Sequence, residues 1–108
     1  MSINEINVLV LAYLGDTIYE DYIRKYLINK GIAKVNDLQK EASLYVSAKG
    51  QASFLKQLLE VEFFSEEEQS IIRRARNNKS NSHPKNCDII TYKHATALEA
   101  LIGYLELS

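Results

Sequence analysis

The chain has 108 residues, 46% of them hydrophobic, and a formal net charge of −1. This length predicts one compact domain that buries only about 60–70% of its unfolded surface, so the domain would gain from oligomerisation. No run of about 18 uncharged apolar residues is present, which argues against a transmembrane helix. The N-terminus lacks the basic region of a secretory signal, and a single cysteine, Cys87, excludes an internal disulfide. We therefore expect a cytoplasmic protein with no membrane partner.

Basic residues are concentrated in one segment. Six of the 13 Lys and Arg residues fall between Arg73 and His94, where Asp88 is the one acid. The rest of the chain is acidic. We therefore expect this segment to contact an anionic partner locally, and we do not expect the whole protein to coat nucleic acid non-specifically.

The first half of the chain predicts helices. Ser2 and Glu5 have the spacing of a capping box and predict a helix that opens there. Apolar residues between positions 6 and 14 are too dense for a one-sided helix, which indicates burial on most sides. Between positions 16 and 29 apolar residues recur every three or four positions, and Gly31 is the expected stop. Gly15 either divides this region into two helices or bends one.

The second half is also predicted to be helical. A helix start is expected at 36–39, and the stretch 51–59 either continues that helix or meets it at Gly50. Ser65 with Glu68 forms another capping box, which opens a helix reaching about Arg76. The polar residues 77–86 predict an exposed loop, and residues 91–107 predict a final apolar helix. Because no strand pattern is longer than a few residues, the fold class expected is all-α.

Isolated acids in apolar helices raise a chemical question. Asp16 and Glu20 lie one turn apart, where like charges repel, and Glu99 is the one charge between positions 95 and 105. Buried acids are costly unless they are paired or bound to metal. Gathered acids would suit a hard cation such as Mg²⁺. Alternatively, Asp16 caps a helix after Gly15 and Glu99 pairs with a base such as Arg24.

Four motifs in order resemble the ribonuclease III family. LAYLGDTIYE (11–20) is similar to its signature motif, and TALEALIGYL (96–105) to its second acidic motif. LQKEASLYVSAKGQA (38–52) resembles the helix between them. These stretches, together with the RRARNNKS and PKNCD segments (73–80 and 84–88), most resemble the Mini-ribonuclease III branch. The resemblance covers roughly residues 5–107.

The resemblance implies a site and a cofactor. Asp16 and Glu99 match the family's invariant acids, so both are expected to be catalytic ligands of Mg²⁺, with Mn²⁺ as a substitute ion. Glu20 matches a Mini-ribonuclease III position and is a further catalytic candidate. Ala12 and Thr96 stand where most ribonuclease III enzymes have two more acids, and the Mini-ribonuclease III branch shares both departures.

The resemblance also implies partners. Double-stranded RNA is the expected substrate, and the expected RNA-binding residues are Arg73, Arg74, Arg76, Lys79, Lys85, Asn86 and Lys49. The alternatives are a solvated loop whose bases balance an acidic body and, for Lys49, an ordinary surface lysine. The family dimerises through its signature helix, so Tyr13, Leu14 and Thr17 are expected at a homodimer interface. A single catalytic domain over 1–108, with no double-stranded-RNA-binding domain, is expected.

Together these features predict a homodimeric, Mg²⁺-dependent endoribonuclease with a ribonuclease III-like helical endonuclease domain. The resemblance implies a role in maturation of ribosomal RNA (23S). One alternative is a non-catalytic RNA- or ribosome-binding dimer with the same fold, which the departures at Ala12 and Thr96 would favour. Another is a helical protein–protein dimerisation domain.

Overall fold

The computed structural model describes residues 2–78 and 87–108, which form helices joined by short turns. Its elements are η1 (Ile3–Glu5), α1 (Val8–Asn29), α2 (Val35–Val46), α3 (Ala48–Glu60), α4 (Glu66–Arg76) and α5 (Ile89–Leu107). The described residues contain no strand, which confirms the all-α prediction. No helix among them is both long and apolar enough to cross a bilayer.

The beginning of α1 differs from the prediction. Ser2 precedes only a short 3-10 turn and makes no side-chain capping bond, so the capping box expected there was wrong. Asn7 caps α1 instead, because its Oδ1 accepts a hydrogen bond from the Leu9 backbone N–H at 2.8 Å. The helix then continues unbroken through Gly15 to Asn29. Asp16 is therefore an interior residue of α1 and does not cap a second helix.

Glycine and serine mark the next boundaries. Gly31 has a φ of +100°, the left-handed conformation that ends many helices, as predicted. The break between α2 and α3 comes at Ser47, whose hydroxyl accepts from the Gly50 N–H at 3.1 Å and caps α3. Gly50 lies inside the first turn of α3, against the Leu44 carbonyl oxygen. The two helices therefore meet at an angle and do not merge into one.

The last two helices begin at side-chain caps. Ser65 and Glu68 form the predicted capping box, since each side chain accepts a hydrogen bond from the other residue's backbone N–H. Asp88 caps α5 through the Thr91 N–H at 2.9 Å. The exposed loop predicted for 77–86 lies outside the described residues from position 79 onward.

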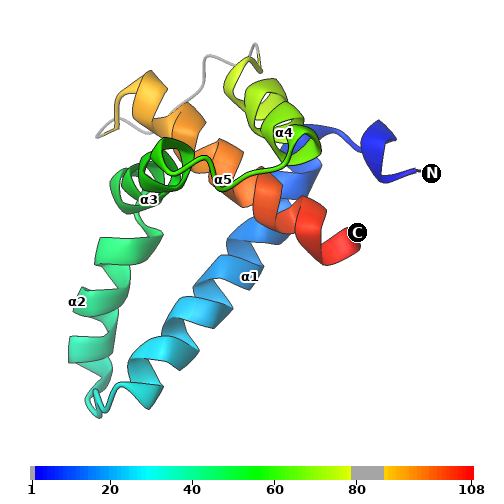
Figure 1. The fold of residues 1–108 in the computed structure, drawn as a ribbon. Helices are drawn as coiled ribbons and strands as arrows, with labels where there is room; N and C mark the ends of the chain where they lie inside the picture. The colour runs from blue at the N-terminus through cyan, green and yellow to red at the C-terminus, as the bar shows by residue number, and fades with distance from the viewer. Residues whose placement is uncertain (1, 79–86) are drawn as a thin grey trace.

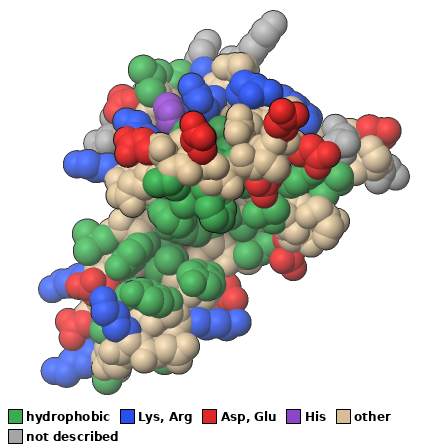
Figure 2. Space-filling model, viewed as in Figure 1, with side chains coloured by type: hydrophobic (Ala, Val, Ile, Leu, Met, Phe, Trp, Pro, Cys, Tyr) green, Lys and Arg blue, Asp and Glu red, His purple; other side chains and the backbone are tan. Residues whose placement is uncertain are grey.

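Helix α5 is the centre of the domain, with α1, α3 and α4 packed around it (Figure 1). Its buried face joins α1 and α4 in one core, which includes Leu11, Leu98, Leu101, Ile71 and Ile72. The second half of α1 and the whole of α2 extend from this core as a hairpin. Helix α2 has no fully buried residue, and hydrophobic side chains lie exposed between α1, α2 and α3 (Figure 2).

Candidate active site

The two acids expected in the site lie where α1 crosses α5. The crossing is unusually close, because a Cβ atom on Gly15 would overlap the carbonyl oxygen of Glu99. Gly103, one turn further along α5, meets the Leu11 carbonyl in the same way. Any larger residue at either position would separate the helices. The glycine before Asp16 therefore has a steric role, which places Asp16 beside Glu99.

The carboxyl groups of Asp16 and Glu99 lie within hydrogen-bonding reach of each other. Burial, together with the hydrogen bond and the negative charge of Asp16, raises the pKa of Glu99 to about 8. Asp16 is on the exposed side of the pair, and Glu99 is partly buried. The pair thus holds a proton at neutral pH and has one edge open to solvent. Among the described residues, no third Asp, Glu, His or Cys joins them in a cluster.

Gln51 is a neighbour of the pair that the motifs in the sequence did not predict. Its side-chain Nε2 donates to Oε2 of Glu99 at 3.4 Å, and this bond opposes the rise in the pKa of Glu99. One sign of this role was available in the sequence. Gln51 occupies the apolar face of its helix, one turn before the fully buried Leu55. Glutamine is seldom buried in this way on the apolar face of a helix.

Glu20 and Arg24 pair with each other. The Arg24 guanidinium donates to Glu20 Oε1 at 2.9 Å, one turn beyond Asp16 along α1. The alternative in which Arg24 neutralises Glu99 was therefore wrong. Both residues also line an apolar hollow between α1 and α2. The structure does not bring Glu20 into a cluster with Asp16 and Glu99.

The two positions that depart from the acid pattern are buried beside the pair. Ala12 lies one turn before Asp16 on α1, within the core. Thr96 lies one turn before Glu99, and its hydroxyl donates to the Tyr92 carbonyl oxygen at 3.0 Å. The threonine oxygen is thereby engaged by its own helix.

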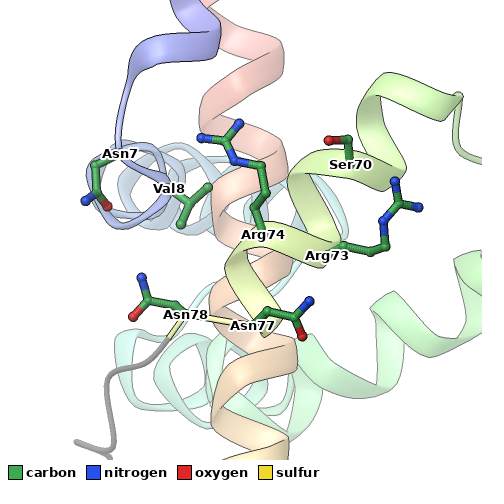
Figure 3. Close-up of a pocket in the computed structure, with 7 residues that line it drawn as sticks. All are labelled: Asn7, Val8, Ser70, Arg73, Arg74, Asn77 and Asn78. Atoms are coloured by element: carbon green, nitrogen blue, oxygen red, sulfur yellow. The ribbon is translucent and has the colours of Figure 1, made fainter.

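A basic hollow of about 530 Å³ lies at the N-terminal end of α1, against the last turns of α4. Figure 3 shows its described lining, which has two guanidinium groups, amides and a hydroxyl and no acid: Asn7, Val8, Ser70, Arg73, Arg74, Asn77 and Asn78. Arg74 also donates to the Ile6 carbonyl oxygen at 3.5 Å, so it helps to hold the chain before α1. Val8 precedes Asp16 by eight residues, or roughly 12 Å along the helix axis.

The remaining expected RNA-binding residues are scattered or not described. Arg76 is exposed near the end of α4, and Lys49 is exposed in the first turn of α3. Lys79, Lys85 and Asn86 lie outside the described residues. On the face shown in Figure 2, Lys and Arg side chains gather beside α4.

The residues expected at a dimer interface follow one side of α1. Tyr13 is 84% exposed, Thr17 is exposed and Leu14 is half-buried. Leu9 and Val10 extend the same surface toward the start of the helix, and both are exposed. The first half of α1 therefore buries one side in the core and leaves a second apolar side uncovered.

Residues 9–108 match the family model of the ribonuclease III domain. The Mini-ribonuclease 3 of Brevibacillus brevis is 54% identical over 105 residues, which cover 97% of this chain and 77% of that protein. The Mini-ribonuclease 3 of Streptococcus pneumoniae is 44% identical over 108 residues, covering 100% of this chain and 84% of that protein. A crystal structure of a Fusobacterium nucleatum protein superposes with a TM-score of 0.85 at 38% identity, covering 97% of this chain and 82% of that one.

The chain belongs to the ribonuclease III family, and it is an endoribonuclease. The Brevibacillus and Streptococcus relatives are Mini-ribonuclease 3 proteins, the branch that the sequence motifs predict. Family membership over nearly the whole chain favours the catalytic alternative over a binding module without activity.

Proposed function

We propose that Asp16 and Glu99 form the cation-binding and catalytic pair of an endoribonuclease that cleaves double-stranded RNA with Mg²⁺. The main support is the contact between the two carboxyl groups at the crossing of α1 and α5. Two adjacent acids, one of them partly buried, destabilise each other when both are ionised. Asp16 and Glu99 would together hold a divalent cation, whose positive charge would relieve that repulsion.

The donor set suits the proposed ion. Mg²⁺ in nucleic-acid enzymes is commonly held by one or two carboxylates, with waters and substrate phosphates completing its coordination. Asp16 and Glu99 supply two carboxylates, and no third acid joins them within the described part of the chain. Mn²⁺ accepts the same oxygen donors and is expected to substitute.

The chain's own residues then have distinct tasks. Glu99 must release its proton before the pair can bind a cation, so binding at neutral pH should liberate a proton. Asp16, on the exposed side, faces the approaching substrate. When bound, the cation supplies positive charge that makes water a better nucleophile and stabilises the leaving oxyanion. No histidine or cysteine nucleophile is needed for such a hydrolysis.

Family membership and the basic hollow support double-stranded RNA as the substrate. Phosphate contacts supply most of the affinity for nucleic acids, and an A-form duplex is recognised mainly through its backbone and 2′-hydroxyls. The described lining of the hollow offers guanidinium, amide and hydroxyl groups that can donate to phosphate and sugar oxygens. The resemblance to Mini-ribonuclease III extends the proposal to precursors of ribosomal RNA, including 23S, in the cytoplasm.

A homodimer would use the uncovered side of α1. Tyr13, Leu14 and Thr17 form a surface that would bury an aromatic ring and aliphatic groups against a second copy. Symmetric association would also carry two Asp16–Glu99 pairs, one for each strand of a duplex.

The decisive experiment incubates end-labelled duplex RNA with the protein in Mg²⁺, in Mn²⁺ and in EDTA. We expect cleavage with either ion and none in EDTA. Loss of an outer-shell group typically lowers activity by about 10–100-fold. Asp16→Asn and Glu99→Gln should each lower the cleavage rate by more than that. Asp21→Asn is the matched control, because Asp21 lies on the same helix and pairs with Lys25 at 2.9 Å. Full activity in Asp16→Asn would refute the assignment.

The same assay tests Glu20. If Glu20 acts at the cation, Glu20→Gln should lose nearly as much activity as Asp16→Asn. Near-normal activity would leave Glu20 as the partner of Arg24.

A further inference from the structure

Two polar residues are buried among those that the structure describes, Gln51 and Thr96. Thr96 lies one turn before Glu99 on α5, and Gln51 reaches Glu99 from α3. A buried polar group costs free energy unless it is hydrogen-bonded. The Thr96 hydroxyl is satisfied locally by the Tyr92 carbonyl. Gln51, in contrast, donates across the domain to the Glu99 carboxylate.

Packing alone does not call for an amide at position 51. The side chain is 2% exposed on a helix face shared with the buried Ala52 and Leu55. A methionine of similar length would fill such a position without a desolvation cost. The amide is therefore best explained by its contact with Glu99.

The start of α3 holds Gln51 at a fixed place. The Ser47 cap ends α2 and begins α3, and Gly50 allows the Leu44 carbonyl to lie directly against the new helix. Gln51 follows at once, in the first turn of α3, where it faces α5. Its reach to Glu99 is thus set by backbone geometry.

We propose that Gln51 is a positioning residue for the metal site: its amide holds the Glu99 carboxylate in the orientation that, with Asp16, receives the cation. The inference rests on the proposed function of that pair. A carboxylate has lone pairs on both oxygens, so one N–H bond to Oε2 leaves Oε1 free for a ligand role. A neutral amide orients the carboxylate and leaves its negative charge intact, whereas a lysine or arginine would neutralise that charge. Such outer contacts commonly tune metal affinity.

The test measures Mn²⁺ binding to the RNA-free protein by titration calorimetry. Gln51→Met keeps the side-chain length and removes the donor, and we expect its Kd for Mn²⁺ to rise about tenfold. Leu55→Met is the matched control, because it alters a buried residue one turn along α3 and should leave the Kd unchanged. Gln51→Asn keeps the amide on a side chain that is one methylene shorter, and it should also weaken Mn²⁺ binding. This variant replaces Gln51→Met in the test if the methionine variant does not fold.

A kinetic measurement separates positioning from a general structural effect. In Gln51→Met the Mg²⁺ concentration for half-maximal cleavage should rise about tenfold, while the rate at saturating Mg²⁺ approaches that of the original protein. An unchanged Kd in both Gln51 variants, or an equal loss in Leu55→Met, would overturn the inference.

The Asp16→Asn variant distinguishes the two proposals. If it binds Mn²⁺ as tightly as the original protein, the metal pair itself is wrong, and the role of Gln51 falls with it. If it loses Mn²⁺ binding while Gln51→Met retains it, only the positioning role is refuted. Absence of Mn²⁺ binding in the original protein would overturn both.

Discussion

Gly15 lies directly against the backbone of Glu99, and this contact fixes the distance between the two acids of the site. A methyl group on Gly15 would overlap the Glu99 carbonyl oxygen, so α1 and α5 approach backbone to backbone. Asp16 follows Gly15 immediately, which places its carboxylate beside that of Glu99. The same pair of residues therefore determines both a core contact and the site geometry.

Gly15→Ala should destabilise the domain and separate the acid pair. Overpacking of a close helix crossing typically costs about 1–3 kcal/mol, and here the obstacle is backbone that cannot rotate away. Thermal unfolding would measure the loss, and cleavage rate per folded molecule would measure the displacement. Gly31→Ala is the comparison. An added Cβ on Gly31 would meet no other atom, but the φ of +100° would be strained for alanine. This substitution should cost about 1–2 kcal/mol in strain and leave activity per folded molecule intact.

The raised pKa of Glu99 predicts how stability changes with pH in the metal-free protein. The folded protein holds this proton up to about pH 8, whereas the unfolded chain releases it near the ordinary glutamate pKa of 4.5. Between these values the folded state binds more protons, so the free energy of unfolding should fall as pH rises from about 4.5 to about 8. Melting temperatures in EDTA across this range should therefore decline by several degrees.

Glu99→Gln removes the titrating group and should flatten that decline. Added Mg²⁺ should also reduce it in the original protein, because the cation favours the ionised carboxylates. An equally steep decline in Glu99→Gln would show that other groups cause the pH dependence.

Local patterns predicted most of the fold because they depend on neighbouring residues. The Ser65–Glu68 cap and the Gly31 stop are satisfied within one turn of chain. The start of α1 was wrong for the opposite reason. Ser2 and Glu5 have the right spacing for a capping box. The helix begins instead at the Asn7 cap, because Val8 is buried in the core. Which of two possible caps begins the helix depends on tertiary packing and not on the local sequence alone.

The site was predictable only in part. Asp16 and Glu99 stand out because charges interrupt apolar helices, and the structure brings them together. Gln51 carries no charge, and its place on the apolar face of its helix is the one sign that the sequence offers. Its role depends on how α3 packs on α5, which no local pattern shows. The pairing of Arg24 with Glu20, by contrast, joins residues four positions apart on one helix and could have been predicted from the sequence.

If the uncovered side of α1 is the dimer interface, a charged residue placed on it should make the protein monomeric. Tyr13→Glu places a charge at the centre of the proposed dimer surface, where burial without a partner is costly. Because Tyr13 is 84% exposed in the single chain, the fold should be unaffected. Light scattering should give a dimer for the original protein and a monomer for Tyr13→Glu. Tyr22→Glu is the control, since Tyr22 is exposed on a different face of the same helix. A dimer that survives Tyr13→Glu would place the interface elsewhere.

The basic end of α4 predicts a change in salt dependence. Replacement of Arg73 and Arg76 with Ala should weaken duplex binding and reduce the slope of log affinity against log salt by about 1 for each phosphate that is no longer bound. Binding would be measured in EDTA with the Asp16→Asn variant, so that the RNA stays intact. Lys25→Ala is the control, because Lys25 pairs with Asp21 on the extended half of α1. An unchanged slope would show that α4 does not contact the RNA.

Thr96 allows a test of the charge at the site. Its side chain is buried one turn before Glu99, and its hydroxyl donates to the Tyr92 carbonyl. Thr96→Asp removes that donor and adds a third acid on the same side of α5 as Glu99. The metal-free protein should lose about 1–3 kcal/mol, because a polar group becomes buried without its hydrogen bond. The added carboxylate should in return attract a hard cation more strongly.

Cleavage rate measured against Mg²⁺ concentration should therefore reach half its maximum at a lower concentration in Thr96→Asp than in the original protein. Thr96→Val is the matched control, because it keeps the branched shape and removes only the hydroxyl. It should lower stability without changing the Mg²⁺ requirement. If the half-saturating concentration does not fall in Thr96→Asp, position 96 does not face the cation. The two-acid site would then be complete with Asp16, Glu99 and the phosphate of the substrate.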